Sequence, residues 1–360
     1  MNQGWPWAGF SRPRPLQKFP AWLGLLYFAV ATDLFAAAAG IPPGAVEAAV
    51  PPACRCPVQR APAPRREGND VLVELPAWRP RHPARHLVPA FGALTTAPYS
   101  VRFELTAEAA GHWSDWVGTT TLGPAAFATV ASRAEILEAQ IDLWQTTVPV
   151  ERVRLRVRLR ADDPPALLEA PWLVTLSAWD GSDGSGAPAV GTVSLPVPAL
   201  SQMAEGGALG PRICSPTSVA MVLAYWSAAD QVGRLAAEMF HPVLDLYGVW
   251  PAAIRAAARR GVLGYLLRFP DWASAAWCLA RGLPIIASVR YAAGELRGAA
   301  VSATPGHLLV LTGYEDDVVL VNDAAAGEAS GVPRRYPLAD LARVWLERTG
   351  VGYVLFRPPG

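Results

Sequence analysis

The sequence predicts two domains of different class, an all-β sandwich-like domain followed by an α+β domain. Residues 152–160 read RVRLRVRLR, with aliphatic and arginine side chains in strict alternation. Alternation with a period of two is typical of a half-buried antiparallel strand. The stretch DGSDGSGAP at residues 180–188 then indicates a flexible break. Beyond it, helices come first and hairpin-joined strands come later, which favours an α+β architecture over a doubly wound sheet.

The N-terminus is expected to be a signal peptide or membrane anchor over residues 1–40. Basic residues between positions 12 and 18 precede an apolar run, and residues 36–40 are small enough for a cleavage site. The apolar run resumes after Asp33, which leaves an uncleaved anchor as the alternative. Asp33 argues against that anchor, because a carboxylate inside a bilayer is costly. We therefore expect a secreted or extracytoplasmic membrane-anchored protein that meets the membrane only through this segment.

The amino-acid composition of the remaining residues indicates where their linkers and domains lie. Residues 41–68 are rich in proline, alanine and arginine without periodicity, so they are expected to form a linker. Short alternating strands between turn-forming residues predict a β-sandwich accessory domain over residues 69–180. A flexible linker is expected over residues 181–190, and the α+β domain over residues 191–360.

Charge and cysteine content exclude some classes of protein. A net charge of +1 over 360 residues gives no reason to expect nucleic acid as a partner. Four cysteines are few for a disulfide scaffold, and Cys54 and Cys56 are too close in sequence for an easy mutual bridge. They also lack nearby residues to complete a zinc site. Cys278 lies in an apolar helical pattern and is expected to be a buried small hydrophobe. We expect neither a metal nor an organic cofactor.

A cysteine and a glutamine flank a loop rich in glycine and proline. Cys214 lies where this loop becomes an apolar helix, predicted over residues 215–226 with Ser215 as its cap. The unpaired N–H groups of a helix start favour a thiolate. Gln202 lies twelve residues upstream, and its amide can donate a hydrogen bond to an oxyanion.

A base and a carboxylate follow in a predicted hairpin. His307 opens an apolar strand, and Asp323 follows the end of the next strand, residues 318–322. In a short antiparallel hairpin the start of one strand lies beside the end of the next, so the two side chains should be neighbours. An aspartate there would orient the imidazole and stabilise its cation. The order Gln, Cys, His, Asp thus predicts a thiol hydrolase. The other expected elements are helices at residues 250–260, 271–281 and 338–348 and strands at residues 284–291, 307–314 and 352–357.

Each of these features also has a structural interpretation. A lone cysteine at a helix start is usually structural, and Asn-Asp after a strand is often only a turn. His241 is an alternative base, although surface exposure is the plainer expectation. Residues 292–305 form either a cleft wall or lid beside His307 or a simple connector. Residues 112–116, HWSDW, offer an aromatic platform for a glycan or protein ligand, or ordinary packing.

The segment from about Pro196 to the C-terminus resembles the peptidase C39-like family of papain-like cysteine peptidases. The resemblance depends on PALSQM, CSPTSVAMVLAYW, GEL, TPGHLLVLTGYE, VLVNDAAA, and RRY followed by residues 341–345. It implies a papain-like α+β domain, in which a helix bearing the nucleophile packs on an antiparallel sheet bearing the histidine and aspartate. One departure is that Ala324 follows the Asn-Asp pair, where family members commonly have proline.

The resemblance implies Cys214 as nucleophile, His307 as base, Asp323 as its orienting carboxylate and Gln202 as oxyanion donor. Some relatives cut leader peptides inside ABC exporters. This chain has no lysine after Lys18, so it contains no Walker motif, and that role is not carried over. The expected function is an exported cysteine peptidase that cleaves peptide or amide bonds through an acyl-enzyme on Cys214. The alternatives are a cell-wall amidase or acyltransferase with the same triad, acting on cell-wall-derived substrate, and a catalytically inactive surface binding protein.

Overall fold

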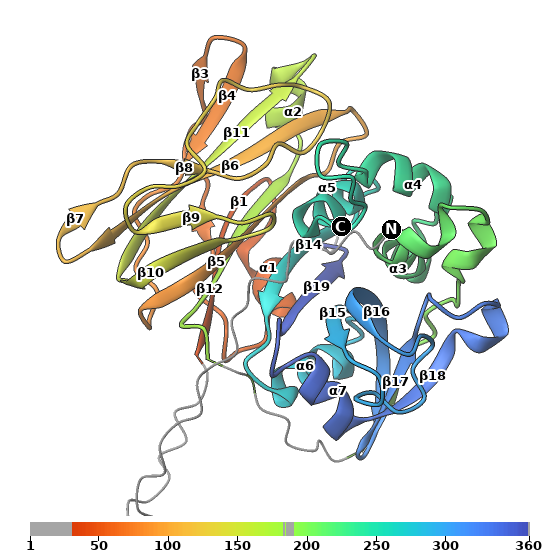
Figure 1. Cartoon of the computed structure of the whole chain (residues 1–360). Coiled ribbons are helices and arrows are strands. Elements are labelled where there is room, and N and C mark those ends of the chain that lie inside the picture. Colours follow the sequence, from red (N-terminus) through yellow and green to blue (C-terminus); the bar gives the residue numbers. More distant parts are fainter. Residues whose placement is uncertain (1–30, 183, 185–190, 359–360) are drawn as a thin grey trace, which may run out of the picture.

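The computed structural model describes residues 31–182, 184 and 191–358. Within them, three sheets and the helices around them form a mixed α and β structure with mostly antiparallel pairing. Two sheets make up an N-terminal domain, and the third, with most of the helices, makes up a C-terminal domain (Figure 1). Most of the predicted signal segment, and most of the linker predicted at residues 181–190, lie outside the described residues.

The N-terminal domain contains two six-stranded sheets. The first has the spatial order β2 (Gln59–Arg60), β1 (Thr32–Ala39), β12 (Trp172–Trp179), β5 (Ala84–Ala93), β10 (Trp144–Val150) and β9 (Leu137–Ala139). The second has the order β3 (Arg65–Glu67), β4 (Asp70–Glu74), β11 (Arg152–Ala161), β6 (Tyr99–Ala109) and β7 (His112–Trp113), with β8 (Val117–Gly118) also paired to β6. The alternating stretch RVRLRVRLR lies within β11, a central strand of the second sheet.

A single apolar core is shared by these two sheets. Phe91 and Val174 of the first sheet lie in the same buried cluster as Phe103 and Val157 of the second. The buried Trp144 of β10 also donates its indole N–H to the carbonyl of Val117 in β8, at 3.0 Å. The inward positions of alternating strands thus supply the contact between the sheets, as their period of two requires.

The predicted boundary at residue 40 is wrong. Residues 32–39 form β1, which pairs along its whole length with β12 and is buried almost throughout. Asp33 is buried in this strand and accepts hydrogen bonds from the backbone N–H and side chain of Arg81. An apolar run with small residues suits a buried strand as well as a signal peptide. The cleavage site expected at residues 36–40 therefore falls inside a sheet.

The linker predicted over residues 41–68 is also wrong, because this segment is folded. It contains α1 (Pro43–Ala49) and strands β2 and β3. Val46 and Cys54 are fully buried, and the backbone of Cys54 exchanges hydrogen bonds with Leu34 and Pro51. Prolines in this segment begin a helix and shape turns. The segment therefore has the amino-acid composition of a linker although its side chains are packed in the folded protein.

The C-terminal sheet positions the candidate site. Its order is β14 (Leu263–Arg268), β19 (Val351–Phe356), β15 (Ile285–Tyr291), β16 (Thr304–Glu315), β17 (Val318–Asn322) and β18 (Pro333–Pro337), with β13 (Thr192–Ser194) beside β16. The strands expected at residues 284–291, 307–314, 318–322 and 352–357 correspond to β15, β16, β17 and β19. The hairpin of β16 and β17 contains a register shift between Leu311 and Gly313.

The helices within the described residues are mostly short. They are α1, α2 (Pro164–Glu169), α3 (Cys214–Tyr225), α4 (Val232–Met239), α5 (Trp250–Ala258), α6 (Trp272–Ala280) and α7 (Leu338–Val344), with 3₁₀ turns η2 (Gln202–Glu205), η3 (Gly210–Arg212) and η4 (Ala329–Gly331). Asp271 caps α6 as expected, accepting the N–H of Ser274 at 2.7 Å. The last helix, α7, ends at Val344, four residues before its predicted end.

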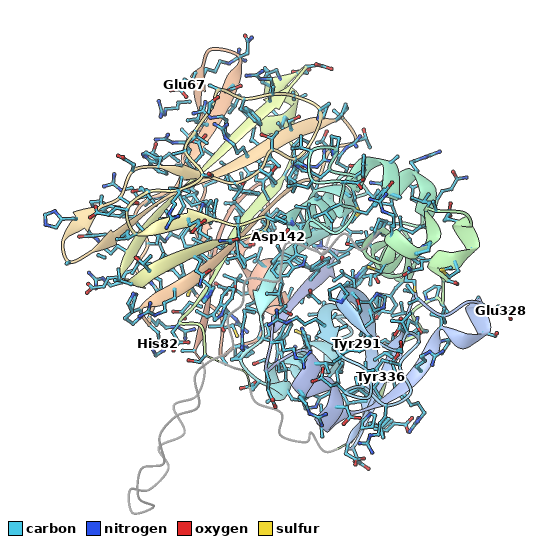
Figure 2. The ribbon with its side chains drawn as sticks, viewed as in Figure 1. Glu67, His82, Asp142, Tyr291, Glu328 and Tyr336 are labelled. Atoms are coloured by element: carbon cyan, nitrogen blue, oxygen red, sulfur yellow. The ribbon has the colours of Figure 1, made fainter. Side chains whose placement is uncertain are left out.

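The two domains pack directly against each other. Helix α5 lies on β5 (Figure 1), and a Cβ on Gly92 would come within 2.7 Å of the Ala258 Cβ, so the two elements approach as closely as a glycine permits. The Asp142 carboxylate of the N-terminal domain accepts the N–H of Trp250 at the start of α5, at 2.5 Å, and Figure 2 shows Asp142 at this junction. The N-terminal and C-terminal domains are therefore joined by close packing as well as by the chain.

Candidate active site

Cys214 is the first residue of α3. The 3₁₀ turn η3 leads into the helix, and Ile213 is the N-cap residue without a side-chain capping bond. The helix thus begins one residue earlier than predicted, and Ser215 is not its cap. Helix α3 packs on β16, to which Ser218 donates a hydrogen bond at the carbonyl of Leu308, 3.2 Å away. This packing brings the first turn of the helix against the strand that carries His307.

His307 and Asp323 are in contact, as the hairpin predicts. The Nε2 of His307 lies 2.8 Å from Oδ1 of Asp323, and both side chains are buried. Because Nε2 donates to the carboxylate, Nδ1 is the ring nitrogen left for Cys214, whose side chain lies close enough to contribute to the charge stabilisation of His307. The structure therefore brings the predicted cysteine, histidine and aspartate together at one site.

The charge on His307 is stabilised by its neighbours. Burial lowers the pKa of His307, but the Asp323 charge, the hydrogen bond to Asp323 and the hydrogen bond with Cys214 outweigh burial and raise this pKa to about 10. At neutral pH the ring is then an imidazolium. A cation beside a thiol favours the thiolate, so the arrangement suits a thiolate–imidazolium pair.

Asp323 accepts hydrogen bonds from other groups besides His307. The Tyr336 hydroxyl donates to Oδ2 at 2.7 Å, and the backbone N–H of Ala325 donates to Oδ1 at 3.1 Å. Burial raises the pKa of Asp323, but the His307 charge and these hydrogen bonds lower it to about 2. The carboxylate therefore stays ionised. Ala324, which departs from the family pattern, leaves these contacts in place.

Tyr336 is a site residue to which sequence reasoning assigned no role. It lies on β18 and is fully buried. Its backbone pairs with Val319 of β17, and its side chain reaches Asp323, which follows the end of β17. Figure 2 shows Tyr336 close to Tyr291 in the C-terminal domain. The only sequence signal was the RRY that contributed to the family resemblance.

Gln202 connects the two halves of the site. Its backbone N–H donates to the carbonyl of Ala324 at 2.9 Å, and its side-chain Nε2 donates to the carbonyl of Gly210 at 2.9 Å. The residue is buried in η2 and is thus fixed between the loop after Asp323 and the loop before Cys214. An amide nitrogen carries two hydrogens, so one remains for an oxyanion.

The alternative base, His241, lies elsewhere. Its Nε2 is 2.6 Å from the Thr120 hydroxyl of the N-terminal domain, and its Nδ1 accepts the N–H of Leu244 at 3.2 Å. Burial lowers the pKa of His241. It is a buried histidine at the domain junction rather than the exposed one expected.

The other cysteines are poor nucleophiles. Burial raises the pKa of Cys54 to about 12 and that of Cys56 to about 11, and it raises the pKa of Cys278 further still. All three are free thiols, and Cys278 is buried as predicted. Their surroundings favour the neutral thiol.

The loop at residues 292–305 is tied down at several points. Glu295 pairs with Arg348 at 2.6 Å, Arg297 pairs with Asp340 of α7 at 2.6 Å, and Arg334 donates to the carbonyl of Gly298 at 2.7 Å. These bonds fix the loop to α7, to β18 and to the segment that follows α7.

The aromatic residues in the HWSDW segment are covered by arginines. Arg152 and Arg154 of β11 lie over the Trp113 ring, at 5.4 and 4.6 Å from its centroid, and Arg156 lies 3.9 Å from the centroid of Trp116. Cation–π contacts therefore occupy ring faces that a sugar would need, which favours the packing interpretation of this segment.

Among the described residues, no cluster of three or more histidine, cysteine, aspartate or glutamate side chains could hold a metal ion. Within the same residues, no helix has the length and apolarity needed to cross a membrane.

Comparisons with known proteins concern the C-terminal domain. The model of the Peptidase_C39 like family matches residues 194–353. No curated protein matches the chain. Among solved structures, a candidate C39-like peptidase from Bacillus anthracis is similar, with 19% sequence identity, a TM-score of 0.38, and coverage of 47% of this chain and 100% of that one. At this TM-score the structural likeness carries no conclusion of its own.

Proposed function

The C-terminal part of the chain is a C39-like domain, and from this premise we propose that the protein is a thiol hydrolase that cleaves peptide or amide bonds. The observation that carries the proposal is the hydrogen-bonded chain of His307, Asp323 and Tyr336 with Cys214 beside His307. A cysteine nucleophile needs a proton partner and an orienting group, and this arrangement supplies both.

The proposed reaction has two halves. The Cys214 sulfur, whose proton His307 has taken, attacks the carbonyl carbon and forms a tetrahedral oxyanion. Hydrogen bonds from the free Nε2–H of Gln202 and from the Cys214 N–H stabilise that oxyanion, since the first N–H groups of a helix have no intrahelical partner. His307 then protonates the leaving amine, which leaves a thioester. Water, from which the neutral His307 takes a proton, attacks the thioester carbonyl; the sulfur leaves as the thiolate, and the thiolate–imidazolium pair is restored.

The test is a digest of a peptide library and of purified cell-wall material with the full chain. Wild type should cleave, and Cys214→Ser should abolish turnover while binding remains. Cys278→Ala is the matched control, because it removes a buried thiol outside the site and should keep activity. Peptide products favour a peptidase, and released wall fragments favour the amidase alternative. Turnover that persists in Cys214→Ser contradicts the proposal.

We further propose that the N-terminal sheets form a β-sandwich accessory domain and that the protein is exported. Two sheets around one core support the first point. The basic and apolar residues before Thr32 support the second. Because β1 begins at Thr32, any cleavage that preserves the fold falls before it. N-terminal sequencing of the protein from culture supernatant and membranes tests this, and a mature end inside β1 would contradict it.

A further inference from the structure

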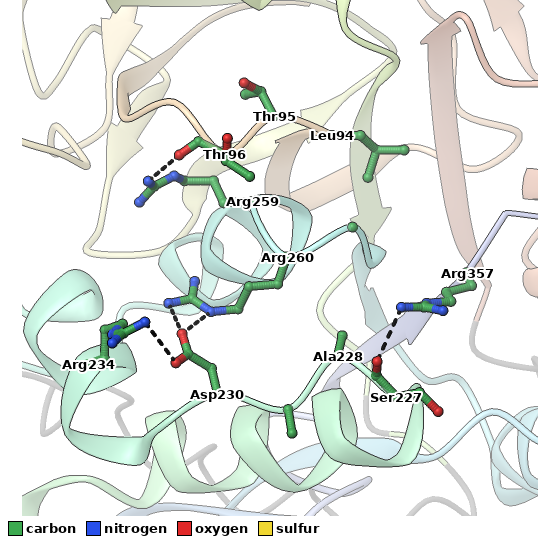
Figure 3. A pocket seen from close by; sticks show the side chains of 12 residues that line it. Leu94, Thr95, Thr96, Ser227, Ala228, Asp230, Arg234, Arg259, Arg260 and Arg357 are labelled. Atoms are coloured by element: carbon green, nitrogen blue, oxygen red, sulfur yellow. Dashed lines mark hydrogen bonds and ion pairs between the residues drawn. The ribbon is translucent and has the colours of Figure 1, made fainter.

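A cleft of about 580 Å³ lies between the two domains. One wall is Leu94–Thr96, which follow β5 of the N-terminal domain, and the other walls come from the C-terminal domain: residues 227–230, Arg234, residues 259–261 and Arg357 (Figure 3). Its volume falls within the range of small-molecule sites. Joint construction by two domains is also common for such sites.

This cleft is separate from the site at Cys214. It lies past the C-terminal end of α3, because residues 227–230 follow that helix, whereas Cys214 begins it. A helix of 12 residues spans about 18 Å. Whatever binds in the cleft therefore does not contact the thiol directly.

Arginines outnumber carboxylates around the cleft. Arg260 is held by Asp230 at 2.7 Å and by Glu238 at 2.9 Å. Arg259 pairs with Glu238 at 2.8 Å and also donates to the carbonyl of Thr96 at 2.6 Å, across the domain boundary. These two arginines and two carboxylates form a closed network that shapes the floor of the cleft.

The two other arginines are only loosely held. Arg234 lies 3.6 Å from Asp230, with 68% of its side chain exposed. Within the described part of the chain, Arg357 donates one long hydrogen bond, to the carbonyl of Ser227 at 3.5 Å. Figure 3 shows them on opposite sides of the cleft. Each guanidinium has five N–H donors, so both retain donors that can turn toward a ligand. Their two positive charges are not balanced by the closed network.

Nearby helix ends do not neutralise this charge. Backbone carbonyls at a helix C-terminus attract cations, but those at the end of α3 accept bonds from Trp226, Ser227 and Ala228. At the end of α5, the N–H groups of Arg260 and Gly261 donate to the last turn in the same way. The surplus of positive charge is therefore available to an anion.

We infer that this cleft binds a small organic anion with at least two carboxylate or phosphate groups, held between Arg234 and Arg357. Guanidinium groups bind both kinds of oxyanion in a bidentate manner. The hydroxyls of Thr95, Thr96 and Ser227 add neutral hydrogen-bonding groups along the walls. Because the ligand touches both domains, its binding also stabilises their association.

Isothermal titration calorimetry on the full chain, in low-salt buffer, tests the inference with citrate and glycerol 3-phosphate. At least one of them should bind wild type, and the double variant Arg234→Gln/Arg357→Gln should bind it at least about tenfold more weakly. The pair Arg79→Gln/Arg335→Gln is the matched control, because it removes two exposed arginines elsewhere that pair with Glu151 and Glu315. Circular dichroism melts verify that each variant is folded.

Binding of citrate alone identifies carboxylates as the ligand group, and binding of glycerol 3-phosphate alone identifies phosphate; either result supports the site. Two results overturn it. One is that neither anion binds wild type. The other is that the cleft variant and the control variant lose affinity equally, which would make the interaction a general charge effect.

Discussion

Replacing Asp323 with asparagine should change how the reactivity of Cys214 depends on pH. Asp323 stabilises the imidazolium of His307. Asparagine keeps the shape of the side chain but removes its charge. Burial, which alone lowers the pKa of His307, then leaves the ring neutral at pH 7. The thiol loses the cation that favours its ionised form.

The size of the effect follows from the protonation of His307. With a pKa of about 10, all but about 0.1% of the rings are charged at pH 7, and the charge persists at lower pH. The imidazolium beside Cys214 then persists from pH 5.5 to 7.5, so we expect the alkylation rate of Cys214 to change by less than about threefold over this range. An ordinary thiol, by contrast, gains nearly tenfold in thiolate per pH unit below its pKa. The Asp323→Asn rate should therefore rise by about 100-fold over the same range.

The assay is the rate of iodoacetamide labelling, with the labelled peptide identified by mass spectrometry. It requires no knowledge of the substrate. Asp317→Asn is the matched control, since Asp317 is an exposed aspartate in the turn of the same hairpin and should keep the flat profile. A flat profile in Asp323→Asn, or a steep one in wild type, would refute the ion-pair reasoning.

Three further variants test the packing around the site and between the domains. Tyr336→Phe leaves one oxygen of the buried Asp323 without its 2.7 Å hydrogen bond and should lower the free energy of unfolding by about 2 kcal/mol, measured by urea titration; no change would mean that the bond is not made. Burial raises the pKa of Asp142 to about 8, above its value of about 3.9 when unfolded, so the free energy of unfolding of wild type should fall as the pH rises from 4 to 8. Asp142→Asn escapes this loss and should gain up to about 4 kcal/mol relative to wild type between pH 5 and 8. A difference that stays constant with pH would argue against a protonated carboxyl. Gly92→Val places carbon where Ala258 already lies and should cost about 1 to 3 kcal/mol in the same titration, whereas Gly44→Ala, with open space around it, should be close to neutral.

Much of the candidate site could be predicted from local patterns. A hairpin constrains which residues face each other, so the contact of His307 with Asp323 followed from the positions of two strands. The helix that begins at Cys214 was found to within one residue, because a loop rich in glycine and proline gives way to an apolar run. Tyr336 could not be placed in this way, since its contact with Asp323 depends on β18 pairing with β17, and the sequence between them contains no tight turn.

The N-terminal region shows where composition misleads. The run around Leu34 and Phe35 has the hydrophobicity of an export signal, and the prolines of residues 41–68 resemble those of a tether. Both segments are packed: residues 32–39 form a strand of the first sheet, and Val46 and Cys54 lie in a buried cluster with Tyr265 of the C-terminal domain. The hydrophobicity of a segment indicates that it is buried away from water, but it does not distinguish burial in a membrane from burial in a folded sheet.

The amino-acid sequence alone determined the period of the strands, the start of the nucleophile helix and the order of the reactive side chains, because these depend on neighbours along the chain. Tertiary structure decided the rest: the buried Asp323 carboxylate that outweighs burial and keeps His307 charged, the hydroxyl that holds Asp323, the arginines over Trp113, and the close packing of Gly92 on Ala258. Each of these depends on residues far apart in the chain, whose proximity is set by the packing of sheets and helices rather than by any local pattern.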